Sequence, residues 1–584
     1  MARISIFLIV VALIAGMVGC AQPAQYRLII SSTEGGEITT PHEMTSTYEE
    51  GTIVPLVALP HSGYRFVEWT GDVDTIDDVN AASTSIIMDG DHSITANFEE
   101  TPTITFAVAG PMTEAPGEHH WWGAELARDE INSGPGVNVG GRYHQIELIQ
   151  VDTNEVSGTP EESVAALEAA IDNVDFVVGG FALESVVAYR EVAMDAKRLF
   201  MNCGPSYGSL QYSVVENYDR YKYWFKSMMI NDVFIVRAVL TLTTTIGMTL
   251  KSALASCGEA VAEDYRVPET GKLRVAILAE NATPYSEVGA VAEGYLPLLG
   301  FTVVGTWLVS PAATDITTEL SQIAAKKPHI IFTAFSGLGF PGVGTVYSKQ
   351  KTELGIPAMT MGINTGGALQ SHWADTEGKC NGEIQLDCWS EGLENTLKTI
   401  AFFNAFVAKT GQYPVYTAGT YDAIYSLTEA VEAVSVAHGW RNIAEVIDPA
   451  NIDALIQYLE TSSYTSAAGT SVYYPIPEVD LGNGAYALSE EQVRTLYRGL
   501  GTYSQGDWLC RASAGPHIAH DIVYGHGYAT GIGSQWQDGH KVGVWPIDLG
   551  DDYDAALTNQ YGCWNFEYPG TADVVIPMEG FLAS

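Results

Sequence analysis

Basic residues are scarce in this sequence of 584 residues, which contains 28 Lys and Arg against 70 Asp and Glu. The formal net charge is therefore -42. Such a chain is repelled by nucleic-acid phosphates and by anionic lipid headgroups, so both are poor partners. Charged residues make up only 17% of the sequence and hydrophobic residues 46%, a balance that excludes global disorder and provides for buried cores. We interpret the excess acid as the solvated surface of an exported protein.

Motifs for metal binding and catalysis are also missing. The cysteines form no C-x-x-C pair and no H-E-x-x-H sequence occurs, so the sequence predicts no zinc site, no other metal and no cofactor. The adjacent His119 and His120 do not change this prediction, because neighbouring residues on a helix point about 100° apart. Paired carboxylates of recognisable spacing are absent as well. We therefore predict that the protein is not an enzyme.

Residues 1–20 form a targeting segment. Arg3 is followed by an apolar run at 4–18, which is too short and too close to the N-terminus to favour a spanning helix. The run ends at Gly19-Cys20, which resembles the bacterial lipobox. By that resemblance Cys20 becomes the mature N-terminus and carries the lipid anchor, with residues 21–25 as a tether. The alternative is ordinary signal cleavage with Cys20 as a bystander.

Residues 26–99 are predicted to form a separate β module. Alternating runs such as 26–30 (YRLII) and 94–98 (ITANF) predict short strands between Gly and Pro turns. The segments 63–72 (GYRFVEWTGD) and 94–98 resemble the divergent bacterial B-repeat of surface proteins. We expect Tyr64, Phe66, Trp69 and Phe98 to form the core of this small domain, and we interpret it as a spacer next to the membrane.

Residues 102–584 alternate between predicted strands and helices. The first strand, 104–108, leads through Ala109-Gly110-Pro111 and a polar loop into a helix at 123–132. Further strands are predicted at 145–151, 176–180, 199–201, 273–278, 302–308, 329–333 and 358–361, with a long helix around 232–255 between the two series. Two successive βα series predict two parallel-sheet lobes, and ligands of such lobes bind at the carboxyl edges of the strands.

Three segments of this region resemble a known family. AGP…GAELARDEIN at 109–132, TYDAI at 420–424 and QWQDGHKVGVWP at 535–546 are similar to the branched-chain-amino-acid type of periplasmic solute-binding protein. The resemblance implies an α/β fold with two Rossmann-like lobes, the type I periplasmic binding protein fold, here preceded by the small all-β domain. The sequence is longer than the family pattern near 374–394 and 440–531.

The resemblance also implies where a solute would bind, because the family holds its ligand between the lobes on loops that follow strands. Asn202, Gly204 and Ser206 correspond to groups that bind the solute carboxylate, and Tyr285 to a tyrosine that covers the ligand. The full set of expected ligand-binding residues is Glu114, Pro116, Ala182, Leu183, Asn202, Gly204, Ser206, Tyr285, Phe335, Ser336 and Asn364.

Asn364 bears on the kind of solute. Amino-acid binders of this family tend to have a carboxylate at this position for the α-ammonium group, and a buried ammonium without its counter-charge loses about 2–5 kcal/mol. Two alternatives remain open. Either another acid replaces it, with Glu114, Glu184 and Glu280 as candidates, or the solute is not an α-amino acid.

Six cysteines follow Cys20, at positions 203, 257, 380, 388, 510 and 563. An even number in an exported protein favours disulfides. We predict bridges between Cys380 and Cys388 and between Cys510 and Cys563, although the sequence does not fix the connectivity.

Together these features predict a lipid-anchored protein on the outer face of the cytoplasmic membrane. By the family resemblance it would bind a small polar solute, an amino acid or a related carboxylate or amide, and deliver it to the permease subunits of an ABC importer by hinge closure. The alternative is a ligand-sensing or adhesive surface lipoprotein that uses the same fold without transport.

Overall fold

A computed structural model of the chain describes residues 23–42, 44–61, 63–207, 209–228, 232–336, 342–472, 531–546 and 570–583. The chain divides into two compact units, Met1–Pro102 and Thr103–Ser584. Three residues singled out by the sequence, Cys20, Cys510 and Cys563, lie outside the described residues.

The first unit is an all-β domain. Two sheets, with strand orders β3-β1-β7-β5 and β2-β4-β6, enclose a core that includes Leu28, Leu56 and Trp69. Trp69 and Phe98 are buried as expected, while Phe66 packs against this core and Tyr64 is only half-buried. The strands are β1 (Gln25–Ser32), β2 (Gly36–Thr40), β3 (Thr45–Glu49), β4 (Ile53–Pro60), β5 (Tyr64–Gly71), β6 (Ser83–Ile87) and β7 (His92–Glu100).

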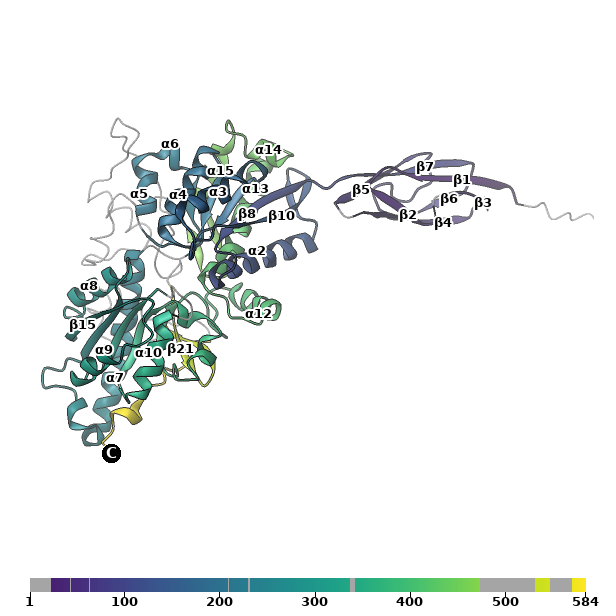
Figure 1. Ribbon diagram of the computed structural model, residues 1–584. Helices are drawn as coiled ribbons and strands as arrows, with labels where there is room; N and C mark the ends of the chain where they lie inside the picture. Colours follow the sequence, from purple (N-terminus) through teal and green to yellow (C-terminus); the bar gives the residue numbers. More distant parts are fainter. Residues whose placement is uncertain are drawn as a thin grey trace, which may run out of the picture. The chain divides into compact units, whose positions relative to one another are not determined.

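The second unit contains two lobes, each built on its own sheet (Figure 1). The sheet of lobe 1 has six strands in the order β13-β12-β11-β8-β10-β9. All neighbours are parallel except the edge strand β9, and β8 starts opposite β10 with Thr103 beside Gln145. The strands are β8 (Thr103–Gly110), β9 (Val137–Val139), β10 (Arg142–Asp152), β11 (Phe176–Gly179), β12 (Leu199–Asn202) and β13 (Trp224–Lys226).

Helices from two distant parts of the chain cover the lobe 1 sheet. Apolar residues of α12, α13 and α15 share one core with β8, β11 and β12, so the chain returns to lobe 1 after building lobe 2. The helices are α2 (Ala115–Ser133), α3 (Pro160–Glu168), α4 (Leu183–Asp195), α5 (Ser209–Glu216), α6 (Tyr218–Tyr221), α12 (Thr399–Thr410), α13 (Thr420–His438), α14 (Ile443–Val446) and α15 (Ile452–Thr461).

The sheet of lobe 2 has seven strands in the order β15-β14-β16-β17-β18-β21-β22. The first five are parallel, and the hairpin β21–β22 is added to β18 in antiparallel pairing. The strands are β14 (Arg274–Glu280), β15 (Thr302–Val309), β16 (Ile330–Phe335), β17 (Met359–Asn364), β18 (Ile384–Asp387), β21 (Ile532–Gln537) and β22 (His540–Trp545).

Two cores cover the two faces of this sheet. One contains residues of α7 and α8, and the other contains residues of α9 and α10. The helices are α7 (Asp232–Cys257), α8 (Tyr285–Tyr295), α9 (Thr317–Ala325), α10 (Gly342–Glu353) and α11 (His372–Asp375). Among the described residues one stretch, Ala238–Ala260, is long and apolar enough to cross a membrane, but 67% of it is buried inside the protein. It is the core helix α7 of lobe 2.

The expected fold class is confirmed, since the chain has α/β lobes and a preceding all-β domain. Two local predictions are confirmed as well. Thr159 and Glu162 form a capping box at the start of α3, and Asp538-Gly539 forms the turn of the β21–β22 hairpin with positive φ at both residues. The predicted start of the first helix is wrong, because α2 begins at Ala115 rather than near residue 123. Pro116 in its first turn supplies the fixed φ that suits a helix start.

The predicted Cys380–Cys388 disulfide is wrong, because both thiols are free. Strand β18 (Ile384–Asp387) lies between the two cysteines and extends the chain by about 3.3 Å per residue. An extended segment between the two cysteines works against the Cα separation of less than roughly 7 Å that a disulfide needs.

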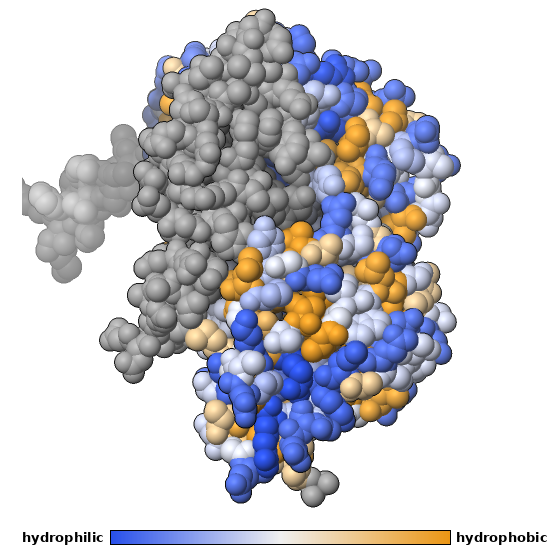
Figure 2. Space-filling model, turned by 90° about the vertical axis from the view of Figure 1, so that its left-hand side faces the viewer, coloured by the Kyte–Doolittle hydropathy of each residue, from blue (hydrophilic) through white to orange (hydrophobic). Residues whose placement is uncertain are grey.

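The distribution of hydrophobic and charged residues on the surface agrees with the acidic composition of the sequence. On the face shown in Figure 2, hydrophobic residues occur in small groups among hydrophilic ones. Several of the few basic residues on the described surface form ion pairs with acidic residues. Examples are Lys409 with Asp129 at 3.0 Å and Lys379 with Glu353 at 2.9 Å. Such exposed pairs contribute little stability.

Candidate functional site

A cavity of about 220 Å³ lies between the two lobes of the second unit. It is lined by loops that follow strands β11, β12 and β13 of lobe 1 and strands β14, β16, β17 and β18 of lobe 2. These loops stand at the carboxyl ends of parallel strands, where α/β sheets bind ligands. Its described lining residues are Phe181, Ala182, Leu183, Glu184, Gly204, Pro205, Ser206, Tyr207, Ser227, Met228, Ile235, Thr283, Pro284, Tyr285, Val288, Ser336, Ile363, Thr365, Ala368, Leu386, Asp387, Cys388, Tyr416, Ser466, Ala468, Gly469, Ser471 and Gly531.

A buried carboxylate fixes the first lobe 1 loop. Glu155 accepts hydrogen bonds from the backbone N–H groups of Phe181, at 3.1 Å, and of Ala182. Its other oxygen accepts from the hydroxyls of Thr153, at 2.6 Å, and Tyr189, at 2.9 Å. Burial raises the pKa of Glu155, and these four donors oppose the shift. Nothing in the local sequence pattern marks Glu155, because three of its four partners are 26 or more positions away along the chain.

The second lobe 1 loop is fixed by Asn202 and Lys226. The Asn202 amide accepts from the Gly204 N–H at 3.1 Å and donates to the Pro205 carbonyl at 2.9 Å. The buried Lys226 ammonium donates to the same carbonyl at 2.6 Å. Gly204 has no room for a side chain, since a Cβ atom there would lie 1.7 Å from the Gly180 carbonyl oxygen. The turn that contains Ser206 is therefore held by the buried side chains of Asn202 and Lys226.

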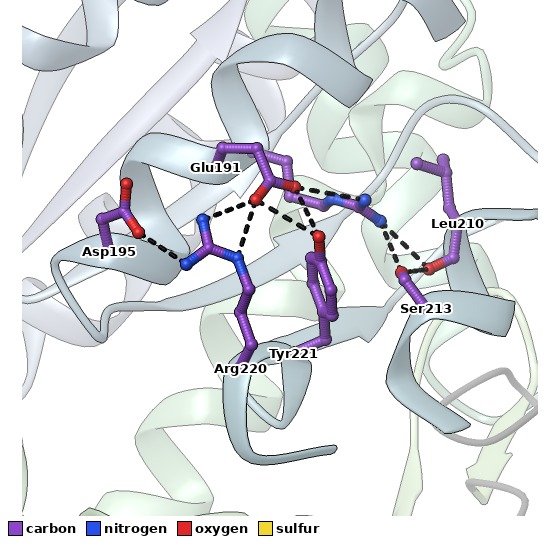
Figure 3. A network of polar contacts seen from close by, with 7 residues as sticks. Glu191, Asp195, Leu210, Ser213, Arg220 and Tyr221 are labelled. Carbon is purple, nitrogen blue, oxygen red and sulfur yellow. Dashed lines mark hydrogen bonds and ion pairs between the residues drawn. The ribbon is translucent and has the colours of Figure 1, made fainter. Parts of the chain in front are cut away.

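A polar network behind the cavity ties α4 to α5 and α6 (Figure 3). Glu191 of α4 accepts from the Arg220 guanidinium at 2.7 and 2.9 Å. The buried Arg190 donates to the Leu210 carbonyl at 3.1 Å and to the Ser213 hydroxyl at 2.9 Å. These contacts fix helices α4, α5 and α6 relative to one another.

The lobe 2 wall is built around Tyr285, the first residue of α8. Its hydroxyl lies 3.5 Å from the Thr365 hydroxyl, and burial raises the pKa of Tyr285. Ser336, at the end of β16, faces the cavity beside the buried Glu280. Burial raises the pKa of Glu280, with Ser336 opposing the shift. The lobe 2 wall thus offers three hydroxyls with one carboxylate behind them.

The segment between α12 and α13 of lobe 1 contributes another tyrosine. Tyr416 lies on the 3-10 helix η5 (Tyr416–Gly419) and lines the cavity. The segment is attached to α2, because the Val415 N–H donates to His119 at 3.2 Å and the Thr420 hydroxyl donates to the His120 carbonyl at 2.6 Å. His120 also contacts the Gly180 carbonyl through its ring at 2.9 Å. The paired histidines therefore hold an aromatic wall of the cavity.

A buried ion pair between Asp387 and Lys541 lies at the cavity wall. Asp387 at the end of β18 lines the cavity, and its carboxylate lies 2.7 Å from the ammonium of Lys541 on β22. Lys541 is fully buried and also donates to the Ala368 carbonyl at 2.8 Å. The charge of Asp387 is thus neutralised within the protein.

The prediction that motifs for catalysis are missing is wrong at one place, because residues 204–208 (GPSYG) match G-x-S-x-G, the nucleophile-elbow pattern of α/β-hydrolases. Such a serine needs a histidine within hydrogen-bond reach. No histidine is among the described residues that line the cavity, and none of the described residues form a group of metal-ligand type. The described lining therefore does not show the histidine that this pattern needs for catalysis.

The sequence of residues 103–475 matches the Periplasmic binding protein family. The chain belongs to this family. Residues 26–102 match the Divergent InlB B-repeat domain. The solved structures similar in fold include a branched-chain amino acid ABC transporter protein from Silicibacter pomeroyi (18% identity, TM-score 0.53, covering 76% of this chain and 96% of that one). A leucine-binding protein from Thermotoga maritima is also similar (15% identity, TM-score 0.50, covering 76% and 97%). Comparison with the curated proteins gives no match.

Six of the residues predicted for a periplasmic binding protein line the cavity: Ala182, Leu183, Gly204, Ser206, Tyr285 and Ser336. The structure brings them together from both lobes. Five others are not among its lining residues. Asn202 lies one step behind the cavity, where it shapes the Gly204 turn. Phe335 packs in a lobe 2 core.

The remaining three lie elsewhere for clear local reasons. Glu114 is the residue before α2, and Pro116 is buried in the first turn of that helix, which replaces the expected loop. Asn364 is turned toward the following segment, where its side chain accepts from the Gly367 N–H at 3.1 Å. Of the candidate acids, Glu184 lines the cavity at an exposed position and Glu280 lies behind Ser336.

Several lining residues of this periplasmic binding protein escaped sequence reasoning. Tyr416 precedes the TYDAI segment but carries no signal of its own. Asp387 and Cys388 lie in the segment 374–394, and Ser466 and Ser471 in 440–531. The sequence analysis predicted that both segments are longer than the family pattern but assigned no binding residue to them.

Proposed function

We propose that this protein is a lipid-anchored extracytoplasmic solute-binding protein that delivers a small polar solute to an ABC importer. The observation that carries the proposal is that loops from the carboxyl ends of both parallel sheets line one cavity. A solute bound there contacts both lobes, and closure of the lobes around it would give the permease a distinct form to recognise. The roles named for the structural relatives, branched-chain amino acid transport and leucine binding, agree with this class.

The lining suggests an amino acid or a related carboxylate or amide as the solute. Ser206, Tyr285, Thr365 and Tyr416 offer hydroxyls, while apolar residues such as Phe181 cover the rest of the wall. Glu184 and Glu280 remain the acids available for a cationic group.

Anchoring is part of the proposal. Residues 1–19 would be removed, and Cys20 would become the mature N-terminus and carry the lipid on the outer face of the cytoplasmic membrane. The B-repeat module at 26–99 would act as a spacer, and the solute-binding unit would begin at residue 102.

The test begins with a thermal-shift screen of the purified second unit attached to its native B-repeat module. The compounds are the twenty standard L-amino acids, γ-aminobutyrate, butyrate, benzoate and nicotinamide. Calorimetry with each compound that raises the Tm is then repeated on two variants. Ser206→Ala should weaken binding about fivefold, since one hydroxyl is lost. Tyr285→Ala should weaken it more, because an aromatic wall is removed.

Tyr143→Ala is the matched control, because Tyr143 is 40% exposed and does not line the cavity. Wild-type affinity in both cavity variants would place the solute site elsewhere. For transport, a strain lacking the gene should lose uptake of the same compound. Unchanged uptake together with intact binding would favour the sensing or adhesive alternative.

A further inference from the structure

A small hairpin, which belongs to neither of the two parallel sheets, forms part of the cavity wall. Strands β19 (Ser463–Thr465) and β20 (Thr470–Val472) pair in antiparallel fashion, with Tyr464 opposite Ser471. Four residues of its turn and second strand line the cavity: Ser466, Ala468, Gly469 and Ser471. The hairpin begins within the long segment 440–531.

The tip of this hairpin is held by one buried carboxylate. Asp422, near the start of α13, is 2% exposed. Its two oxygens accept from the backbone N–H groups of Ala467, at 2.8 Å, and Ala468, at 3.3 Å. The Thr399 hydroxyl donates to the Ala467 carbonyl at 2.6 Å from helix α12. The tip is therefore attached to two helices of lobe 1, which hold it in position at the cavity wall.

The side chains of the hairpin differ in what they offer. The Ser466 hydroxyl is occupied within the turn, where it donates to the Gly469 carbonyl at 2.7 Å. Ala468 is half-buried and presents only a methyl group, so it limits the size of the cavity without filling it. Ser471 is also half-buried and places a hydroxyl on the same wall.

We propose that this hairpin is a third solute-contacting wall, in which Ala468 and Ser471 select the solute and Asp422 is their positioning residue. The inference rests on the proposed solute-binding function and goes further by naming what determines specificity. A solute held by the two lobes also contacts the Ala468 methyl group and the Ser471 hydroxyl. The hairpin, which lies within the residues 103–475 that match the family, thereby shapes the choice of solute.

The test uses the full chain and the compounds of the screen above that raise its Tm. Ser471→Ala should weaken binding about fivefold through the lost hydroxyl. Ala468→Leu should weaken binding of the largest bound compound about tenfold or more, since added methylenes fill the cavity. Thr465→Ala is the matched control, because this exposed residue of the same hairpin does not line the cavity. The apo Tm should be unchanged in all three variants.

The positioning role of Asp422 is tested by hydrogen exchange of the unliganded protein. Asp422→Asn has one acceptor oxygen in place of two, so amides of peptide 463–472 should exchange about tenfold faster while the rest of lobe 1 is unchanged. A uniform rise across lobe 1 would mean that Asp422 has a merely structural role and would overturn this part of the proposal.

The outcomes separate the inference from the proposed function. If Ser206→Ala and Tyr285→Ala weaken binding while Ala468→Leu and Ser471→Ala do not, the interlobe site holds and the hairpin wall is refuted. If none of the four variants changes affinity, or no compound of the screen binds, the proposed solute site fails and the hairpin inference fails with it.

Discussion

Replacing Glu155 by alanine should release the loop at Phe181 and Ala182 from the lobe 1 wall. The carboxylate is the acceptor for both backbone N–H groups and for the hydroxyls of Thr153 and Tyr189. Glu155 is 8% exposed, so water does not replace it at most of these donors. The two hydroxyls rotate to other acceptors, but the two N–H groups have fixed directions and lose their partner.

The magnitude follows from those two amides. A buried donor left without an acceptor costs about 1–3 kcal/mol, so Glu155→Ala should lower the free energy of unfolding by about 4 kcal/mol. Glu155→Gln should cost about 1 kcal/mol or less. Its amide oxygen still accepts from both N–H groups, its NH2 group donates to the two hydroxyls, and the desolvation that raises the pKa of Glu155 no longer applies.

Urea unfolding of the wild type and both variants measures these differences, with Glu161→Gln as an exposed control in the same lobe. Because the loop lines the cavity, Glu155→Ala should also weaken binding of the compounds found in the screen, whereas Glu155→Gln should leave it near the wild-type value. Equal loss of stability in the alanine and glutamine variants would refute the assignment of Glu155 as the acceptor for the loop.

Three further predictions follow from buried or terminal groups. Burial lowers the pKa of His119 to about 3 and of His120 to about 4, below the value of about 6.5 in an unfolded chain. Their contribution to the free energy of unfolding should be complete above about pH 6.5 and fall as the pH drops toward 4, by about 2 kcal/mol each at pH 5. The decrease in the free energy of unfolding between pH 7 and 5 should therefore be smaller in His120→Gln than in the wild type. An equal decrease would contradict the argument. Lys541→Met alone should cost about 3–5 kcal/mol because it leaves Asp387 buried without its counter-ion, and the double variant with Asp387→Leu should recover most of that loss in a double-mutant cycle. Cys20→Ser should release the protein from membranes or leave it unprocessed, and unchanged fractionation with unchanged processing would count against lipidation.

The sequence by itself determined the features that depend on neighbouring residues. Apolar runs of strand length, alternating with helical stretches, predict two parallel-sheet lobes because each element must bury one face. The Thr159 capping box and the Asp538-Gly539 turn form as predicted, since each rests on residues within four positions of one another. The family resemblance then placed six residues on one cavity, because the positions after parallel strands meet at the same sheet edge.

Only the tertiary structure decided which other residues join them. Asp387 and Lys541 pair across 154 positions, and Asp422 contacts Ala467 across 45. No local sequence pattern around either residue of these pairs predicts the contact. The same holds for the disulfide, since the extended strand β18 keeps Cys380 and Cys388 apart despite their short separation in sequence. Periodicity fixes which face of an element is buried, whereas a binding wall depends on which distant side chains the packed elements bring within hydrogen-bond range.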